Sequence, residues 1–357
     1  MNKNLPLSGL KIIDMTQYLP GPLATKILSD LGAEVIKVEF GEGDFLRIIP
    51  PFSQKMSLLF QTLNAGKKSL GLNVQKNEGY EILSKLLQQS DTLIHSFRTR
   101  RAAKLKITFD QLRKIQPQII LCEMLADFEI EAGHDLNFLS LSGILSLRSK
   151  QTGDLPYFQI GDLMGGTLSV VSSLLATIIM REKTRRPQHL QISMLEGTKY
   201  FLNFYFKSVQ KNGIDTLDIL RGKAPCYNIY RCKDGKKIAM AALEPIFWAN
   251  ICEVIKHKDL LDKQFDENYI PELKNIFSQK NRGEWLKMFN SSDTTVSPLL
   301  DRAEVSVNKQ FPAKFNDQSF NLAKKAPLLG EDTKNILENL GYSKVEILRL
   351  RSERIVL

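Results

Sequence analysis

The sequence predicts an α/β protein whose larger part is a doubly wound parallel sheet. Short β-like runs alternate with helical runs up to about residue 125, which is the pattern of strand–helix–strand units. Of the 357 residues, 43% are hydrophobic and 25% charged, a balance typical of globular proteins. At about 150 residues per domain, this length predicts roughly two domains. The pattern changes beyond residue 190, so a second, smaller domain is expected there.

The strands and helices of the first part follow in regular order. The β-like runs are Leu10–Met15, Glu34–Glu39, Ser69–Val74, Thr92–Phe97 and Gln118–Met124, and the helical runs are Leu23–Leu31, Asn77–Gln89 and Phe109–Ile115. Ligands of such sheets bind near the carboxyl ends of the strands. The loop after the first strand, Thr16–Pro22, contains no Gly-x-Gly-x-x-Gly, so nicotinamide binding is disfavoured.

The later part of the chain predicts a small α+β domain. A long helical stretch around Met194–Lys211 precedes two β-like runs, Cys226–Cys232 and Lys237–Ala241. Asp234–Gly235 lies between the two runs, which is the pattern of a β-hairpin. This domain is expected to end near Asn308.

The charge sum is +10, from 49 Lys and Arg against 39 Asp and Glu. Basic surfaces attract nucleic acid because phosphate contacts release counterions. Here basic and acidic residues are interspersed, and the densest basic runs, Arg98–Arg101 and Arg181–Arg186, are short enough for a small phosphorylated ligand to explain them. No zinc-finger spacing, aromatic RNA-binding signature or recognition-helix pattern accompanies the charge, so we expect no nucleic-acid partner.

Cysteine and hydropathy patterns predict the compartment. The four cysteines form no Cys-x-x-Cys pair and only four histidines accompany them, so no metal site is expected. The first ten residues lack the charged and then apolar pattern of a secretory signal peptide, which predicts a cytoplasmic protein with free thiols. The apolar stretch Leu163–Met180 contains glycines, serines and threonines, the composition of a buried helix, so no membrane partner is expected.

Three short segments concentrate residues suited to chemistry: Gly133–Asp135, Gly161–Gly166 and Leu243–Pro245. Each also has a purely structural interpretation. Asp135 could cap a helix over Leu136–Leu147, with His134 incidental. Asp162 could cap the helix that begins at Leu163, with the following glycines allowing tight helix packing. Glu244 could be a surface residue at a strand end.

These segments resemble a known family. Gly133–Phe138 is similar to the Gly-His-Asp-Ile-Asn-Tyr segment of the α-methylacyl-CoA racemases, within the class III (family III) CoA-transferase superfamily. Further matches are Leu19–Pro22, Gly32–Glu39, Gly66–Ser69, Ala224–Tyr227, Leu243–Pro245, Ser292–Pro298 and Ala326–Thr333. They run in order from residue 5 to about 345, so the resemblance covers almost the whole chain.

The resemblance implies an architecture and a substrate. We expect a large CoA-binding domain over 1–190 that residues 325–357 complete, linker helices over 191–222, a small domain over 223–308 and a return linker over 309–324. Members of the family form interlocked homodimers. The substrate would be an acyl-CoA thioester of lipid metabolism, so coenzyme A is part of the substrate and no separate cofactor is expected.

The resemblance also implies two reaction types that use one aspartate differently. In the racemases a histidine and this aspartate, here His134 and Asp162, exchange the proton on C2 of a 2-methylacyl-CoA through an enolate. Glu244, from the partner subunit, would fix the tautomer of His134. In the transferases the aspartate is a nucleophile that becomes an aspartyl-CoA thioester. Transferases commonly have tyrosine in place of His134, and several have glutamine in place of Leu19, so both positions favour a racemase.

Physical chemistry suits this assignment. Racemisation next to a thioester needs a base on one face of C2, an acid on the other, and stabilisation of the enolate oxygen. Imidazole holds either proton state near neutral pH. Asp162, at a helix start, would lie beside free backbone N–H groups that could meet the oxyanion. The alternatives are a CoA-transferase with Asp162 as nucleophile and a homologue that binds CoA without turnover.

Other site residues follow from the same resemblance. Lys67 and Lys68 match the family's basic pair near CoA, and Phe97 and Lys104 fall where relatives touch the nucleotide. Solvated surface positions are the alternative for each of them.

The substrate pocket is expected to include Leu19, Phe138 and Phe158. Phe138 replaces a racemase tyrosine, and Phe158 replaces an asparagine. A more apolar pocket disfavours the charged form of a carboxyl group, so we expect a raised pKa at Asp162.

Overall fold

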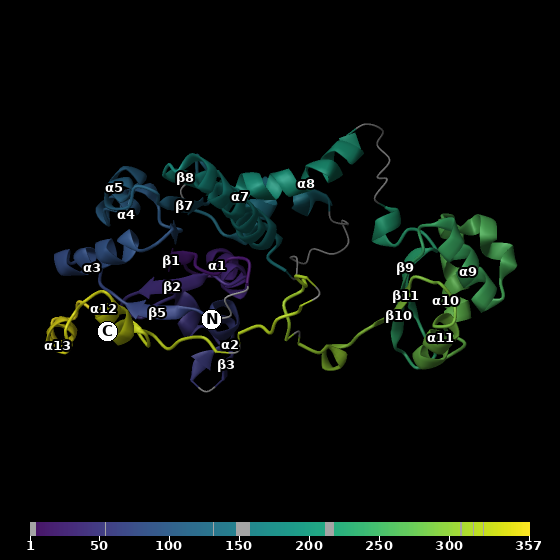
Figure 1. The fold of residues 1–357 in the computed structure, drawn as a ribbon. Helices are drawn as coiled ribbons and strands as arrows, with labels where there is room; N and C mark the ends of the chain where they lie inside the picture. The colour runs from purple at the N-terminus through teal and green to yellow at the C-terminus, as the bar shows by residue number, and fades with distance from the viewer. Residues whose placement is uncertain are drawn as a thin grey trace. The chain divides into compact units, whose positions relative to one another are not determined.

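The computed structural model describes residues 5–53, 55–130, 132–147, 158–210, 218–307, 309–316, 318–323 and 325–357. The chain forms two compact units, which we call the large unit (Met1–Leu202 with Lys309–Leu357) and the small unit (Asn203–Asn308) (Figure 1). Of the expected linker helices, residues 211–217 lie outside the described residues.

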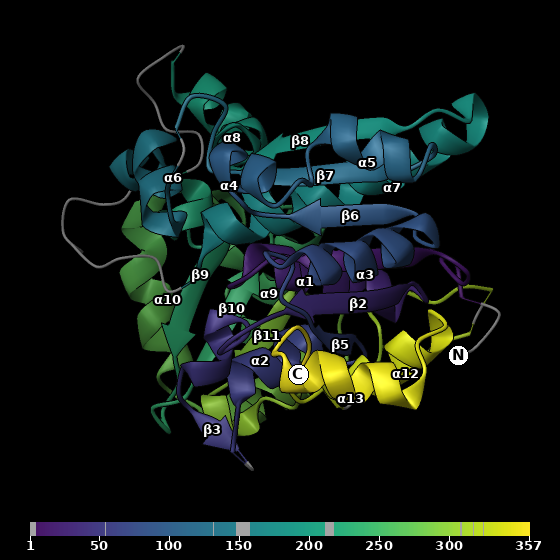
Figure 2. The ribbon, with the colours of Figure 1, turned by 90° about the vertical axis from the view of Figure 1, so that its left-hand side faces the viewer.

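A six-stranded parallel sheet forms the centre of the large unit, which confirms the predicted fold class. Its strands are β1 (Lys11–Met15), β2 (Glu34–Glu39), β5 (Lys68–Gly71), β6 (Thr92–His95), β7 (Ile120–Leu125) and β8 (Gln188–Ser193). Their order is β5-β2-β1-β6-β7-β8, and Figure 2 shows them side by side from β8 to β5. The order reverses between β1 and β6, and ligands of such sheets bind at that reversal.

Helices cover both faces of this sheet. One face carries α1 (Pro20–Asp30) and α7 (Ser169–Thr184), and the other carries α3 (Asn77–Gln88), α4 (Thr99–Lys104), α5 (Phe109–Ile115), α12 (Thr333–Asn339) and α13 (Lys344–Ser352) (Figure 1). The neighbours Ile12 and Ile13 on β1 are both fully buried, each in the core on its own side. Burial on both faces explains why these strands read as continuous apolar runs.

The far end of the chain covers the outer edge of β5. The backbone N–H of Ser69 donates to Asp332 Oδ2 (2.9 Å), and that of Gly71 donates to Thr333 Oγ1 (3.0 Å). The N–H of Leu357 donates to the Gly71 carbonyl at 3.1 Å. The groups that an edge strand leaves open are therefore satisfied by residues more than 260 positions away.

The remaining elements of the large unit lie around the carboxyl ends of the strands. They are η1 (Phe45–Ile48), β3 (Phe52–Ser53), β4 (Met56–Ser57), α2 (Leu58–Asn64), α6 (Asp135–Leu141), η2 (Ile144–Leu147), the π-helix η3 (Gly161–Leu168) and the first part of α8 (Met194–Gln210). The residues of α8 from Asn203 on belong to the small unit. The single helix expected over Leu136–Leu147 is interrupted, because Gly143 takes a positive φ of 79° that ends α6. Strand β8 was not predicted, since it is a half-exposed edge strand.

One helix among the described residues, Gly161–Thr184, is long and apolar enough to cross a membrane by length and composition alone. It comprises η3 and α7. Its residues Val170 and Leu174 are fully buried in the core that α1 and β7 share. A helix packed in this way against a sheet meets the same criterion without a membrane.

The small unit has a three-stranded antiparallel sheet in the order β11-β10-β9. Its elements are η4 (Ile219–Arg221), β9 (Tyr227–Arg231), β10 (Lys237–Ala241), α9 (Pro245–Ile255), η5 (Lys258–Lys263), η6 (Glu267–Tyr269), α10 (Ile270–Phe277), α11 (Arg282–Phe289), β11 (Val296–Leu299) and η7 (Arg302–Glu304). The predicted hairpin is confirmed as β9–β10, with Gly235 at φ +76° in its turn. Strand β11 was missed because it contains Pro298, which is tolerated on an edge strand.

Two histidines and a glutamate lie across neighbouring strands of the large sheet. His95 Nε2 is 3.5 Å from Glu123 Oε1, and His189 Nε2 is 2.7 Å from Glu123 Oε2. His95 is fully buried. Burial lowers the pKa of His95 to about 4, against the opposing attraction of Glu123.

Acid is therefore expected to destabilise the fold through His95. The pKa of His95 is lower in the folded than in the unfolded chain. The contribution of neutral His95 to the free energy of unfolding is therefore complete above pH 6.5 and is lost as the pH falls toward about 4. Between about pH 7.5 and pH 5 the loss is about 2 kcal/mol for this group. Urea unfolding of the wild type and His95→Gln at both pH values measures it. Equal losses in the two proteins would contradict this origin.

Candidate active site

Two of the predicted segments meet at Asp135. His134 is the N-cap of α6, and its backbone N–H donates to Asn137 Oδ1 at 3.0 Å. Asp162 lies in the first turn of η3, and its backbone N–H donates to Asp135 Oδ1 at 3.1 Å. Since His134 directly precedes Asp135, this hydrogen bond brings the two predicted proton carriers to neighbouring helix starts.

Glycines allow η3 to pack closely against its neighbours. A Cβ at Gly161 would lie 3.1 Å from Asp135 Oδ1, and a Cβ at Gly165 would lie 2.1 Å from the Met194 carbonyl oxygen. The second distance is far below any van der Waals contact, so no larger residue fits at Gly165 without a shift of the backbone. The sequence-based interpretation of Gly165 as a position of tight helix packing is confirmed.

The loop after β1 closes on the same site. Thr167 Oγ1, on η3, donates to the Pro20 carbonyl at 2.9 Å. Tyr18 has a positive φ of 65°, and its ring meets the His134 ring edge-on with centroids 5.8 Å apart. Sequence reasoning missed Tyr18, whose only signal was its place in the loop at the carboxyl end of the first strand.

The electrostatics of the site centre on Asp162. Burial, together with the neighbouring charge of Asp135, raises the pKa of Asp162 to about 7. Burial also raises the pKa of Asp135. The direction at Asp162 is the predicted one, but a second carboxylate contributes to it. A carboxyl group with this pKa can hold or release a proton near neutral pH.

One expectation about the oxyanion is wrong. The N–H groups at the start of the helix were expected to be free for the enolate oxygen. The helix begins before Asp162, so the Leu163 N–H donates to the Gln159 carbonyl at 2.9 Å. The Asp162 N–H is taken by Asp135. Both donors are therefore already satisfied within the chain.

The expected pocket residues differ in exposure. Leu19 is half-buried and packs against the small core of Leu46 and Phe60. Phe138 is only 2% exposed and belongs to the core on the α1 face of the sheet. Phe158 is 64% exposed. Their contact with an acyl chain stays a prediction.

A cavity of about 190 Å³ opens at the reversal of strand order. It is lined by residues that follow β1, β2, β5 and β6, including Gln17, Phe40, Gln75, Phe97 and Arg101. The Arg101 guanidinium carbon lies 4.7 Å from the centre of the Phe97 ring. An aromatic face and a cation at one crevice suit an adenine ring and a phosphate. Sequence reasoning named Phe97 but not Arg101, although the basic run Arg98–Arg101 was its signal.

The predicted basic residues lie in different surroundings. Lys67 is buried, and its Nζ donates to Asp14 Oδ2 (3.0 Å), the Pro22 carbonyl (2.9 Å) and Asn64 Oδ1 (2.8 Å). Its three hydrogen bonds link β1, the first turn of α1 and the end of α2. Lys68 is 39% exposed and pairs with Glu34 at 2.5 Å, and Lys104 is exposed at the end of α4. A direct contact of any of the three with CoA stays a prediction.

Glu244 belongs to the small unit, where it is the N-cap of α9 and is exposed. Its carbonyl accepts the N–H groups of Phe247 (3.1 Å) and Trp248 (3.2 Å). The carboxylate makes no capping hydrogen bond to the helix. Its predicted contact with His134 of a partner subunit stays a prediction.

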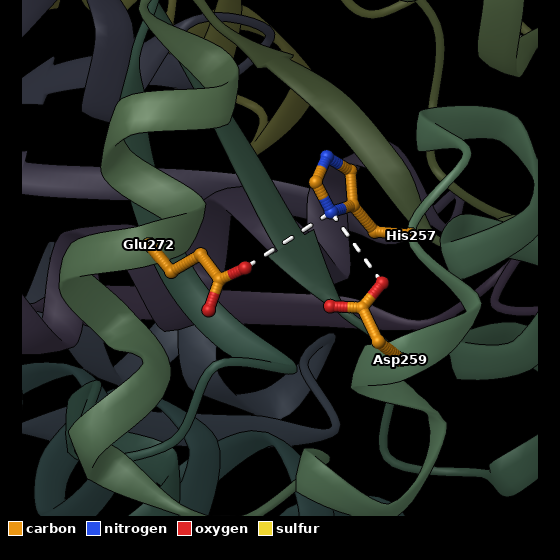
Figure 3. A group of neighbouring side chains, drawn as sticks. All are labelled: His257, Asp259 and Glu272. Atoms are coloured by element: carbon orange, nitrogen blue, oxygen red, sulfur yellow. Dashed lines mark ion pairs between the residues drawn. The ribbon is translucent and has the colours of Figure 1, made fainter.

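Among the described residues, one group offers three metal-ligating atoms within 4.8 Å of one another: His257, Asp259 and Glu272 (Figure 3). His257 Nδ1 lies 3.6 Å from Asp259 Oδ1 and 4.0 Å from Glu272 Oε1. All three side chains are at least 36% exposed. Such hydrated pairs contribute about 0–1 kcal/mol, so we describe them as a surface ion-pair group.

Comparison with known proteins decides the family. Residues 7–314 match the family model described as CoA-transferase family III. The chain belongs to CoA-transferase family III. The predicted resemblance is thereby confirmed.

Family III relatives of both reaction types are similar to this chain. The human alpha-methylacyl-CoA racemase is 29% identical over 387 residues, which cover 99% of this chain and 98% of the relative. The (R)-2-hydroxy-4-methylpentanoate CoA-transferase of Clostridioides difficile is 24% identical, with 98% and 99% covered. Membership in family III therefore leaves the reaction type open.

Solved structures of other proteins share the fold of this chain. A CaiB/BaiF family protein from Brucella suis superposes with a TM-score of 0.82 at 21% identity, covering 94% of this chain and 100% of the other. A Mycobacterium tuberculosis protein gives 0.77 at 21% identity, covering 92% and 98%. At this identity the likeness concerns the fold alone.

Proposed function

We propose that this family III protein is a racemase or epimerase that inverts C2 of a 2-methylacyl-CoA. The observation that carries the proposal is the Asp162 N–H to Asp135 hydrogen bond, which brings His134 and Asp162 to neighbouring helix starts. Similarity to the human alpha-methylacyl-CoA racemase supports the reaction type. No cofactor beyond the substrate's own coenzyme A is needed. We also propose a homodimer in which Glu244 of one subunit fixes the tautomer of His134 of the other.

The chemistry requires two proton carriers and one planar intermediate. One group removes the C2 proton, the thioester carbonyl takes up the electron pair as an enolate, and the other group returns a proton to the opposite face. Imidazole can carry a proton near neutral pH. Asp162 can do the same because its pKa is raised to about 7. We place the nucleotide of CoA in the crevice of Phe97 and Arg101.

Proton NMR in deuterated water tests the proposal. A single-isomer 2-methylacyl-CoA incubated with the wild type is expected to exchange and invert at C2. His134→Ala and Asp162→Ala are expected to lose both exchange and inversion. Absence of exchange with several acyl chains in the wild type would overturn the racemase assignment, and CoA binding without any turnover would then assign a binding role.

Replacing Asp135 by asparagine is expected to shift the pH profile of exchange. Its charge helps to raise the pKa of Asp162, whereas an asparagine Oδ1 can still accept the Asp162 N–H. The limb of the profile that reports Asp162 is therefore expected to move to lower pH, with the fold retained. The pH dependence of kcat/KM in wild type and Asp135→Asn measures the shift. An unmoved or upward-moving limb would show that Asp135 does not set this pKa.

A CoA-transferase is the second candidate, because several similar relatives are named transferases. In that reaction the Asp162 carboxylate attacks the thioester carbonyl, forms a mixed anhydride with the acyl group and releases the CoA thiolate. The thiolate then attacks the aspartyl carbonyl, which gives an aspartyl-CoA thioester and frees the acyl group as its carboxylate. A raised pKa leaves less carboxylate below neutral pH, which disfavours this role. Transfer of CoA to an added free acid, with no exchange at C2, would select the transferase.

A further inference from the structure

A second charged hollow lies wholly within the small unit, beside β9 at the edge of its sheet. Its volume is about 630 Å³, and it lies between the β9–β10 hairpin and α10. Its basic residues are Arg231, Lys233, Lys237 and Lys274. None of these four side chains has a carboxylate partner among the described residues of the small unit. We call this hollow the basic groove.

The acidic residues beside the hairpin are engaged elsewhere. Glu304 forms ion pairs with both Lys236 and Arg282, which lie outside the basic groove. Asp234 accepts the backbone N–H groups of Lys236 and Arg282, both at 3.3 Å. The charges at this end of the small unit are thus segregated, because Glu304 pairs with cations outside the basic groove and Asp234 accepts backbone N–H groups.

The basic groove also places like charges directly opposite each other. Arg231 on β9 and Lys237 on β10 are register partners in the antiparallel pair, and both are exposed. Like charges at such positions are destabilising, since their Cβ atoms lie about 5 Å apart. An anion bound between them would relieve this repulsion and accept hydrogen bonds from both side chains.

The size and walls of the basic groove indicate the class of anion. A single phosphate group carries at most about two negative charges near neutral pH. The four cations of the basic groove exceed that number, so a ligand with two phosphate groups matches their charge better. Ile229, 50% exposed, forms an apolar wall next to Arg231. Hollows of about 300–1,000 Å³ are typical of small-molecule sites.

We propose that the basic groove binds a small diphosphate. Arg231 and Lys237 hold one phosphate across the two strands, and Lys233 and Lys274 neutralise the second. Ile229 contacts any organic part that the diphosphate carries. This binding site is independent of the proposed reaction at His134 and Asp162.

The test measures binding of inorganic pyrophosphate, and separately of ADP, to the full chain by calorimetry at low salt. The double variant Arg231→Gln/Lys237→Gln is expected to lose at least about fivefold in affinity for both. The control Lys258→Gln/Lys287→Gln removes two exposed charges from the same unit and is expected to change affinity less than about twofold. Hydrogen exchange is expected to slow in peptides over 227–237 and 270–280 when pyrophosphate is added.

Three results would overturn the proposal. The first is no binding of either diphosphate. The second is an equal loss in both double variants, which would reflect net charge alone. The third is protection confined to the large unit, which would assign the binding to the crevice of Phe97 and Arg101. Binding of ADP with no binding of pyrophosphate would restrict the ligand to organic diphosphates. If neither diphosphate binds, attachment to vesicles rich in phosphatidylserine would assign the basic groove to a lipid surface instead.

Discussion

Exchange of the C2 proton is expected to fall about a thousandfold in Asp162→Asn, since a positioned general acid or base contributes about 10²–10⁴ in rate. Asparagine keeps the shape of the side chain and the backbone N–H that Asp135 accepts. Binding of CoA is therefore expected to persist while the chemistry is lost. Deuterium incorporation by NMR gives the rate, and calorimetry with CoA gives the affinity.

His134→Gln separates the two candidate reactions. A two-base racemase needs the imidazole, so its exchange rate is expected to fall as far as in Asp162→Asn. A transferase needs the aspartate as nucleophile, so CoA transfer would survive in His134→Gln and be lost in Asp162→Asn. Full exchange activity in Asp162→Asn would remove this residue from the mechanism altogether.

The second large effect concerns stability, because Lys67→Met is expected to cost about 3 kcal/mol in the free energy of unfolding. Lys67 and Asp14 are both fully buried side chains that form an ion pair at 3.0 Å. Although burial alone would raise it, Lys67 and Lys37 hold the pKa of Asp14 well below its usual range. Removing Lys67 leaves that buried carboxylate short of one of its two cations.

The adjacent Lys68 provides a matched control. It is 39% exposed and pairs with Glu34 in contact with solvent. Lys68→Met is expected to cost less than about 1 kcal/mol. Urea unfolding of both variants at neutral pH makes the comparison. Similar losses in the two variants would mean that the buried pair contributes no more than a surface pair.

Periodicity predicted the elements that are buried on both sides. β1, β2 and α3 lie within a residue or two of their expected bounds, because continuous apolar runs and helical spacing are local signals. The edge strands β8 and β11 were missed, since partial exposure weakens the apolar pattern and Pro298 argues against a strand.

The residues of the candidate site that lie in sequence motifs were predictable. The contacts between residues far apart in the sequence were not. His134 and Asp162 follow from the resemblance. The hydrogen bond from Asp162 to Asp135 spans 27 residues, and the buried pair of Lys67 and Asp14 spans 53. Nothing in Gly66–Ser69 distinguishes a buried lysine from an exposed one, because the difference depends on where Asp14 lies after folding.

The docking of the last residues along β5 has a consequence for self-association. Until Asp332, Thr333 and Leu357 reach Ser69 and Gly71, a folding chain presents β5 as an open strand with unsatisfied hydrogen-bonding groups. Open strand edges template pairing between molecules. Intermediates with a formed sheet but an undocked tail are therefore the species most prone to aggregate, and variants that weaken α12 or α13 are expected to reduce solubility at high protein concentration before they affect the chemistry at Asp162.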